Sequence, residues 1–220
     1  MDVILLAAGI GKRAKLEYPK QLLKLGEKPL LIHTIELLES ALEINQFIVS
    51  VIPGEKELFE NIISTYGYDH CICVEGGNSR QESVYNALSL CTSDRVLIHE
   101  AVRPFASKEL IGRLILASGQ AVIPCVSETS TVFYKDEYLD RNNVQCVQLP
   151  QIFDTLSLKK AHESAIGKNY TDDSSLLFYE SGILPTIIDG LEENIKITTP
   201  IDRKIAEVIY NETSRSSRRE

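Results

Sequence analysis

The chain has 220 residues, of which 44% are hydrophobic and 25% are charged, and its formal net charge is −8. This balance is typical of a globular protein with a sizeable core, and the length favours one or two domains. The acidic charge argues against wholesale nucleic-acid binding, no apolar run is long enough to span a membrane, and the N-terminus lacks a secretory pattern. We therefore expect neither a nucleic acid nor a membrane as a partner.

The cysteines and histidines indicate neither a disulfide framework nor a zinc site. Cysteine occurs five times, an odd number, without C-x-x-C spacing, and the four histidines show no ligand spacing. We expect reduced, mostly buried thiols that pack as small hydrophobic side chains. Such thiols favour a reducing, cytoplasmic setting.

From the N-terminus, apolar strands alternate with amphipathic helices. Continuous apolar runs predict strands at residues 3–7, 47–52, 71–74, 95–99 and 121–125. Apolar residues at helical spacing predict helices at residues 30–39, 57–66, 80–90 and 107–117. The alternation predicts an α/β fold with a Rossmann-like, mostly parallel sheet.

The alternation stops at residues 128–148, which are polar and favour β structure. We predict a β-hairpin of residues 131–134 and 144–147 that turns at residues 140–143. Such a hairpin protrudes from the sheet and commonly serves as a dimerisation arm or a lid.

The regular pattern resumes after this arm. It predicts a helix at residues 156–165, strands at 184–188 and 195–198, and a helix at 200–210. Residues 211–220 are polar and are expected to form a flexible tail. No repeat or low-complexity tract is present, so we predict one domain over residues 1–210.

The clearest local signal follows the first strand. Gly9 and Gly11 allow backbone N–H groups to approach a phosphate closely. Residues 10–28 carry six lysines and arginines against two glutamates, a net charge of +4 in an acidic chain. A cationic loop at the end of the first strand predicts a polyanionic ligand there, and we favour this over a merely solvated lysine-rich loop. Pro19 argues against a dinucleotide-type helix, and the Walker pattern is absent.

Three further stretches offer chemistry, each with a simpler alternative. Asn78 and Ser83 follow two glycines before a helix, where they bind a ligand or only form a capped turn. Glu100 ends a strand, where it anchors Mg²⁺ or only pairs with Arg103. Lys196 lies on a short strand, and it points to the phosphate site only if the strand ends there. Residues 171–173, Thr-Asp-Asp, bind a ligand or only cap a helix.

Together, these stretches resemble the 2-C-methyl-D-erythritol 4-phosphate cytidylyltransferases. The shared motifs run in chain order from the first strand to about residue 210: A-A-G-x-G-x-R with P-K-Q, G-G-x-x-R-x-x-S-V, a block resembling H-D-x-x-R-P, a pair resembling D-T, D-R before x-P-Q, T-D-D, and N-I-K-x-T-x-P-x-D. No single motif is specific, but their number and order are.

The resemblance implies a CTP-dependent nucleotidyl transfer on a nucleotidyltransferase-type fold. The phosphate of a sugar-alcohol phosphate attacks the α-phosphorus of CTP, and pyrophosphate leaves with Mg²⁺. Positioned cations, rather than covalent chemistry, meet the charge of the transition state. The residues that carry this role by resemblance are Arg13, Lys20 and Lys196.

The resemblance also implies the residues that bind each substrate. The CTP contacts are Ala7, Ala8, Gly9, Gly11, Gly77, Asn78, Ser83 and Ala101. The acceptor contacts are Glu100, Arg103, Thr129 and Arg141, with Glu100 also a candidate metal ligand. Because Thr129 and Arg141 lie on the arm, they are expected to reach the neighbouring subunit, which implies a homodimer.

The departures from the family pattern lie on the acceptor side. Glu100 replaces an aspartate, Glu128 replaces the aspartate of the D-T pair, Thr131 replaces a lysine, and Leu149 replaces a threonine. Two alternatives therefore stay open. One is a ribitol-5-phosphate cytidylyltransferase, from a related group, and the other is a CTP-binding regulator without catalysis.

Overall fold

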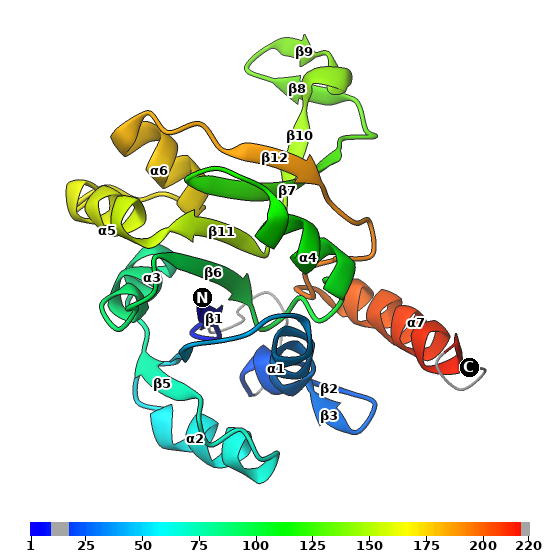
Figure 1. Cartoon of the computed structure of the whole chain (residues 1–220). Helices are drawn as coiled ribbons and strands as arrows, with labels where there is room; N and C mark the ends of the chain where they lie inside the picture. Colours follow the sequence, from blue (N-terminus) through cyan, green and yellow to red (C-terminus); the bar gives the residue numbers. More distant parts are fainter. Residues whose placement is uncertain (10–17, 217–220) are drawn as a thin grey trace.

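A computed structural model describes residues 1–9 and 18–216, with the side chains of residues 214–216 left out. One sheet organises the chain, with the strand order β10-β7-β11-β6-β1-β4-β5 and β12 paired to β7 (Figure 1). Its strands are β1 (Asp2–Leu6), β4 (Phe47–Val51), β5 (Ile72–Glu75), β6 (Arg95–Glu100), β7 (Ala121–Ser127), β10 (Gln145–Val147), β11 (Gln151–Asp154) and β12 (Thr186–Asp189).

The predicted α/β architecture is confirmed. Strand β1 pairs in parallel with β4 and β6, β4 pairs in parallel with β5, and β12 pairs in parallel with β7. Strand β11 is antiparallel to both β6 and β7, and the sequence did not predict it. Its run contains only two apolar residues, Ile152 and Phe153, which is too short to stand out as a pattern.

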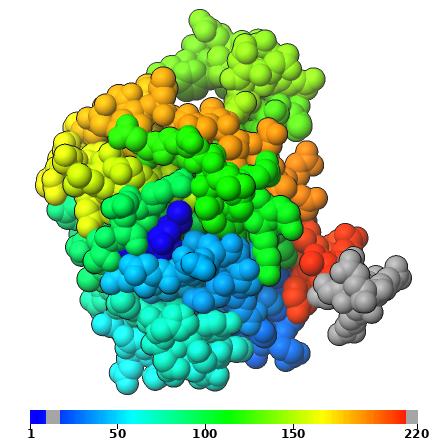
Figure 2. Space-filling model, viewed as in Figure 1, coloured from blue at the N-terminus to red at the C-terminus, as the bar shows by residue number. Residues whose placement is uncertain are grey.

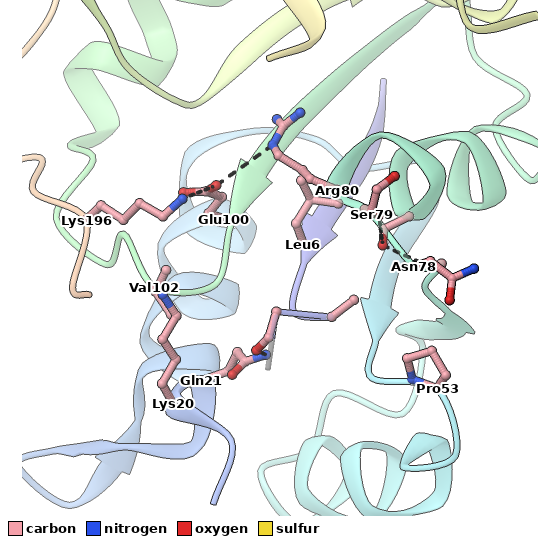
Figure 3. Close-up of a pocket in the computed structure, with 14 residues that line it drawn as sticks. Leu6, Lys20, Gln21, Pro53, Asn78, Ser79, Arg80, Glu100, Val102 and Lys196 are labelled. Carbon is pink, nitrogen blue, oxygen red and sulfur yellow. Dashed lines mark hydrogen bonds and ion pairs between the residues drawn. The ribbon is translucent and has the colours of Figure 1, made fainter. Parts of the chain in front are cut away.

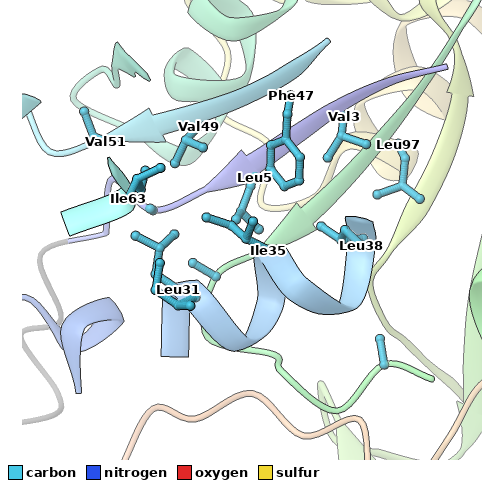
Figure 4. Packing of buried hydrophobic residues seen from close by; sticks show 14 of the residues in the cluster. Val3, Leu5, Leu31, Ile35, Leu38, Phe47, Val49, Val51, Ile63 and Leu97 are labelled. Atoms are coloured by element: carbon cyan, nitrogen blue, oxygen red, sulfur yellow. The ribbon is translucent and has the colours of Figure 1, made fainter. Parts of the chain in front are cut away.

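Helices cover both faces of the sheet. On one face, α1 (Leu30–Ala41), α2 (Lys56–Thr65) and α4 (Lys108–Leu116) pack on a cluster that includes Leu5 and Phe47 (Figure 4). On the other face, α3 (Arg80–Leu88), α5 (Thr155–Ser164) and α6 (Asp173–Ser181) pack on a cluster that includes Ile4 and Phe153. Alternate residues of β1 therefore face opposite clusters, as expected of a strand that is buried on both sides.

The order of the strands creates a crevice beside β1. The chain moves outward from β1 to β4 and β5, then crosses back to form β6 on the other side of β1. Ligands of open α/β sheets bind outside the carboxyl ends of the strands at such a switch point. Leu6 and Glu100 are register partners at these ends of β1 and β6.

The protruding arm is present, but its strand pairing differs from the prediction. Strand β8 (Val132–Tyr134) pairs with β9 (Glu137–Leu139), whereas β10 pairs with β7. The hairpin turns at Lys135 and Asp136, which have φ values of 47° and 67°. Without a glycine or asparagine, this turn carries no strong sequence signal. The expected turn at residues 140–143 contains the short helix η3 (Arg141–Asn143), and the whole arm projects from the molecule (Figure 2).

The C-terminal part also differs in detail. Residues 195–198 form no strand, although the N–H of Ile197 donates to the carbonyl of Val102 at 3.0 Å. The predicted strand 184–188 is observed as β12, and α6 was not predicted. Helix α7 (Pro200–Ser216) continues beyond residue 210, so residues 211–216 are helical rather than a frayed tail.

A small third cluster joins α7 to the N-terminal half. Buried Leu23, Leu25 and Ala206 pack together, and they bring α7 against the short strand β2 (Lys24–Leu25), which pairs with β3 (Lys28–Pro29). The short helix η2 (Lys20–Leu22) leads into β2. The same cluster includes Val102, just after β6, and Ile197, so the segment before α7 (the red helix in Figure 1) lies near the carboxyl end of β6.

The cysteines are reduced and mostly buried, as expected. All five are free, and only Cys146 is exposed. Burial raises the pKa of Cys71 and of Cys91 to about 12, so both thiols stay protonated near neutral pH. Over residues 1–9 and 18–216, no helix combines the length and apolarity that a membrane crossing requires.

Candidate active site

A cavity of about 440 Å³ opens at the carboxyl ends of β1 and β6 (Figure 3). Segments that are far apart in the sequence line it: the end of β1, η2, the turn before α3, the end of β6 and the segment before α7. The structure brings together eight of the residues that the resemblance assigned to the site, namely Ala8, Gly9, Lys20, Gly77, Asn78, Ser83, Glu100 and Lys196.

The other assigned residues that the structure describes do not line the cavity. Ala7 and Ala101 are buried beneath the cavity, where the N–H of Ala101 donates to the carbonyl of Leu6 at 3.0 Å. Arg103 supports Glu100 from behind, without lining the cavity. Gly11 and Arg13 lie outside the described residues. Thr129 and Arg141 are exposed on the arm, where Nη1 of Arg141 donates to the carbonyl of Thr129 at 2.8 Å.

The loop after β1 is held by a residue that the sequence analysis did not assign. The buried side chain of Gln21 donates from Nε2 to the carbonyls of Ala7 and Gly9, the latter at 2.9 Å. Two carbonyl acceptors fix the orientation of the amide. Because these carbonyls are tied to Gln21, the backbone on either side of Ala8 has a defined direction at the cavity wall. The P-K-Q motif was the available signal, but only its lysine was given a role.

The turn before α3 is shaped by close packing of its glycines. A Cβ atom on Gly76 would lie 2.5 Å from Cβ of Ala8, and one on Gly77 would lie 2.2 Å from Cγ of Glu82. Both are distances that real side chains do not adopt, so the turn requires glycine. The N–H of Gly77 donates to Oγ of Ser83 at 3.0 Å. The turn therefore lies close against the loop after β1.

The turn also caps a helix, which was the simpler of the two interpretations from the sequence. The side chain of Ser79 accepts from the N–H of Glu82 and caps α3. The same turn nevertheless presents Gly77 and Asn78 to the cavity. Capping and exposure to the cavity therefore occur together, and neither excludes the other.

Glu100 is the electrostatic centre of the cavity. Its Oε1 lies 2.7 Å from Nζ of Lys196 and 3.9 Å from Nε of Arg80, and its Oε2 lies 3.3 Å from Nε of Arg103. Burial alone would raise the pKa of the Glu100 carboxyl, but these cations outweigh burial and hold that pKa below its ordinary value. The expected pairing with Arg103 is confirmed, and it is one of three such contacts.

A buried chain of charges lies behind Glu100 and was not predicted. Nη2 of Arg80 lies 2.7 Å from Oδ2 of Asp173, and Oδ1 of Asp173 lies 3.2 Å from Nε2 of His162. The carboxylate of Asp172 accepts from the N–H groups of Ser174 and Ser175, so the helix-cap interpretation of Thr-Asp-Asp is correct. The adjacent Asp173 forms an ion pair with Arg80 instead of capping the helix.

Of the cationic stretch at residues 10–28, the structure describes residues 18–28, with three of the six lysines and arginines. Lys20 lines the cavity, and its Nζ donates to the carbonyl of Ile197 at 3.4 Å. Lys24 is exposed on β2, and Lys28 pairs with Glu36 on α1. Of the described lysines in this stretch, only Lys20 faces the ligand space.

The described residues that line the cavity include one candidate carboxylate ligand for a metal ion. Glu100 is the only carboxylate among its described lining residues, and it already contacts three cations. Nowhere in residues 1–9 and 18–216 do three or more candidate side chains gather as a metal site would require. This donor set fits a magnesium ion that arrives on ligand phosphates, because Mg²⁺ commonly binds through one carboxylate and phosphate oxygens.

The fold and the cavity define a class of protein. A lysine-lined cavity at the switch point of an open α/β sheet, bordered by glycine turns and a helix N-terminus, is the arrangement of nucleotide-binding α/β enzymes.

Comparison with known proteins narrows this class. The sequence model of the 2-C-methyl-D-erythritol 4-phosphate cytidylyltransferase family matches residues 1–212. The 2-C-methyl-D-erythritol 4-phosphate cytidylyltransferase of Bacteroides fragilis is 36% identical over 215 residues, which cover 94% of this chain and 97% of the relative. The chain therefore belongs to the 2-C-methyl-D-erythritol 4-phosphate cytidylyltransferase family, a family of nucleotidyltransferases.

Solved structures agree with this assignment. The 4-diphosphocytidyl-2C-methyl-D-erythritol synthase of Anaerococcus prevotii aligns with a TM-score of 0.82 and 28% identity, covering 96% of this chain and 95% of that one. The bifunctional IspDF of Campylobacter jejuni aligns with a TM-score of 0.83 and 29% identity over 93% of this chain. The alignment covers 53% of that protein, so this chain spans about half of its length.

Proposed function

We propose that this chain transfers CMP from CTP to 2-C-methyl-D-erythritol 4-phosphate and releases pyrophosphate, in non-mevalonate isoprenoid precursor synthesis. The single observation that carries the proposal is that Lys20 and Lys196 line one cavity with the glycine turns, in a chain whose family match extends over residues 1–212. Two cations from opposite ends of the described chain at one cavity suit a ligand with several phosphates.

The reaction is an in-line displacement at phosphorus. A phosphate oxygen of the acceptor forms a bond to the α-phosphorus of CTP, and the bond to the β-phosphate oxygen breaks, so that pyrophosphate leaves. Lys196 contacts the α-phosphate and the incoming phosphate. Lys20 and Arg13 hold the triphosphate, so that cations already in place meet the charge of the transition state.

The nucleotide lies between the two glycine turns. The backbone of Ala8, Gly9 and Gly11 receives the triphosphate, while Gly77, Asn78 and Ser83 contact cytosine and ribose. The buried Ala7 and Ala101 support these contacts without touching the ligand. The hydroxyl of Ser83 already donates to the carbonyl of Ser79 at 2.8 Å. It therefore has only acceptor capacity left for the ligand, which suits the exocyclic amino group of cytosine.

The acceptor lies on the side of Glu100 and Arg103, and it is completed by the arm of a second subunit. Thr129 and Arg141 of that arm contact the acceptor phosphate, so the active form is a homodimer. The large exposed side chains of Phe133, Tyr134 and Tyr138 support this proposal. Such apolar surface on a projecting arm is typical of a protein interface.

A magnesium ion is part of the proposal. Glu100 is the described carboxylate that would help to hold a magnesium ion brought by the phosphates of CTP. Such an ion would supply positive charge that neutralises the phosphates. A cytoplasmic location is also proposed, since all five thiols are free.

The departures from the family pattern bear on the choice of acceptor. Leu149, one departure from the family pattern, is buried in the core cluster and does not line the cavity. Thr131 is exposed on the arm. Of the four departures, Glu100 alone lines the cavity, and its extra methylene favours testing ribitol 5-phosphate as an alternative acceptor.

The experiment is a pyrophosphate-release assay with CTP and Mg²⁺. The two acceptors are assayed separately, UTP and ATP replace CTP as controls, and a chelator removes the metal. We expect turnover with CTP and 2-C-methyl-D-erythritol 4-phosphate only. Turnover with ribitol 5-phosphate alone would replace the proposed acceptor. CTP binding without pyrophosphate release from any acceptor would identify a regulator instead.

A further inference from the structure

We propose that Arg80 is a positioning residue, which holds the side chain of Glu100 in place when Lys196 turns from Glu100 to the substrate phosphate. This inference rests on the proposed function, in which Lys196 acts on the reacting phosphates. The resemblance gave no role to Arg80, although it lines the cavity at the start of α3.

The two oxygens of Glu100 have different partners. Oε1 accepts a hydrogen bond from Lys196 at 2.7 Å and has Nε of Arg80 at 3.9 Å. Oε2 accepts from Nε of Arg103 at 3.3 Å. Figure 3 shows that Lys196 and Arg80 approach Glu100 from opposite sides. Lys196 therefore leaves Oε1 when it binds a phosphate, whereas Arg103 stays on Oε2.

Glu100 then needs a second counter-charge. Its side chain is only 9% exposed, and a buried carboxylate that loses a partner is strongly disfavoured. Arg80 is the cation already placed at Oε1. Nε of Arg80 lies 3.9 Å from Oε1 of Glu100, which is an ion pair rather than a hydrogen bond. The two side chains can therefore move closer together when Lys196 departs.

Arg80 is itself fixed from behind. Asp173 is 1% exposed, it contacts Nη2 of Arg80 at 2.7 Å, and it is contacted in turn by His162. With Lys196 on the substrate, Glu100 and Asp173 face Arg80 and Arg103. Two carboxylates and two guanidiniums then remain, and their formal charges cancel.

The test is a double-mutant cycle of Arg80→Gln and Glu100→Gln, measured as kcat and as KM for each substrate. If Arg80 acts through Glu100, Arg80→Gln lowers kcat by about tenfold or more in the wild-type background, as a displaced catalytic group does. In the Glu100→Gln background, the same change alters kcat by less than about twofold, because there is no charge left to hold. The KM for CTP changes little in either background.

Control variants separate positioning from folding. Arg95→Gln removes a part-buried arginine at the other end of β6, where it donates to the carbonyls of Ile115 and Ala117. This control should leave kcat unchanged, and thermal unfolding is followed for every variant. If Arg80→Gln does not fold, the cycle is repeated with Arg80→Lys, which keeps the charge beside Asp173 but cannot reach both carboxylates.

The outcomes are distinguishable from failure of the proposed function. If the wild-type chain releases no pyrophosphate with either acceptor, the proposed function fails. If the wild-type chain is active but the two changes multiply in their effects on kcat, or if Arg80→Gln has a wild-type kcat, the inference about Arg80 is wrong and the proposed function stands.

Discussion

The ammonium of Lys196 lies 2.7 Å from Oε1 of Glu100, although 96 positions separate the two residues in the sequence. Glu100 ends a central strand of the sheet, and Lys196 lies in the irregular segment before α7. The contact closes one side of the cavity and holds the Lys196 ammonium next to the place where phosphates are proposed to react.

The first prediction concerns Lys196 itself. Lys196→Ala should lower kcat by roughly 10²–10³-fold, because it removes a cation aimed at transition-state charge. The exposed Lys24→Ala variant is the matched control and should keep the wild-type rate. Steady-state pyrophosphate release is the measurement, and a near wild-type kcat in Lys196→Ala would remove this lysine from the mechanism.

The second prediction concerns the loop after β1. Gln21→Leu leaves the carbonyls of Ala7 and Gly9 without their donor, which should cost about 1–3 kcal/mol of unfolding free energy. CTP affinity should fall as well, because the backbone of the loop after β1 loses its fixed orientation at the cavity wall. Calorimetric titration with CTP measures this loss. The control is Gln120→Leu, which removes only an exposed hydrogen bond to Ser157 and should leave the affinity for CTP unchanged. A Gln21→Leu variant with wild-type affinity for CTP would contradict the role of Gln21.

The third prediction separates the arm from the nucleotide site. Arg141→Ala should raise KM for the acceptor and leave KM for CTP nearly unchanged, because the arm is proposed to reach only the acceptor of the partner subunit. Arg113→Ala, at an exposed site on α4, serves as the control. Equal effects on both KM values would refute the arm assignment, as would a monomeric active enzyme in analytical ultracentrifugation.

The fourth prediction concerns pH and stability. The buried carboxylate of Asp2 accepts from the N–H groups of Thr92 and Ser93 at 2.6 and 2.7 Å, and from the side chains of Ser93 and Asn45. Burial alone would raise the pKa of Asp2, but these hydrogen bonds lower that pKa below its ordinary value. A carboxyl with a lowered pKa stabilises the fold above about pH 4 and loses that effect as the pH falls through the folded-state pKa.

Asp2→Asn should therefore lower the free energy of unfolding by about 1–3 kcal/mol at pH 7, with a smaller difference at pH 3. Urea unfolding at the two pH values measures this dependence, and the exposed Asp94→Asn variant is the control. A difference that is the same at both pH values would show that the carboxylate charge does not matter.

Much of the fold could be predicted because its signals are local. Strands such as β1 and β6 are buried on both faces and read as continuous apolar runs. Strand β11 carries too few apolar residues for such a signal. Its Gln151 is buried and donates to Asp172, a contact that the sequence does not announce.

In the site, too, the residues with local sequence signals could be predicted and the contacts made by packing could not. The glycine turns and the lysines have motif signals, so eight assigned residues do meet at one cavity. Arg80 and Asp173 also lie within recognised motifs, but their contact depends on how α3 and α6 pack, which no single stretch of sequence specifies. The position of Lys196 likewise comes from a backbone contact with Val102 rather than from a strand.

The cavity walls come from Leu6 near the start of the chain and Lys196 near the end of the described fold. A nascent polypeptide emerging from the ribosome can thus complete most of its central sheet before Lys196 is added. Premature termination before that residue would leave one wall of the cavity unbuilt, so the complete cavity requires translation through Lys196.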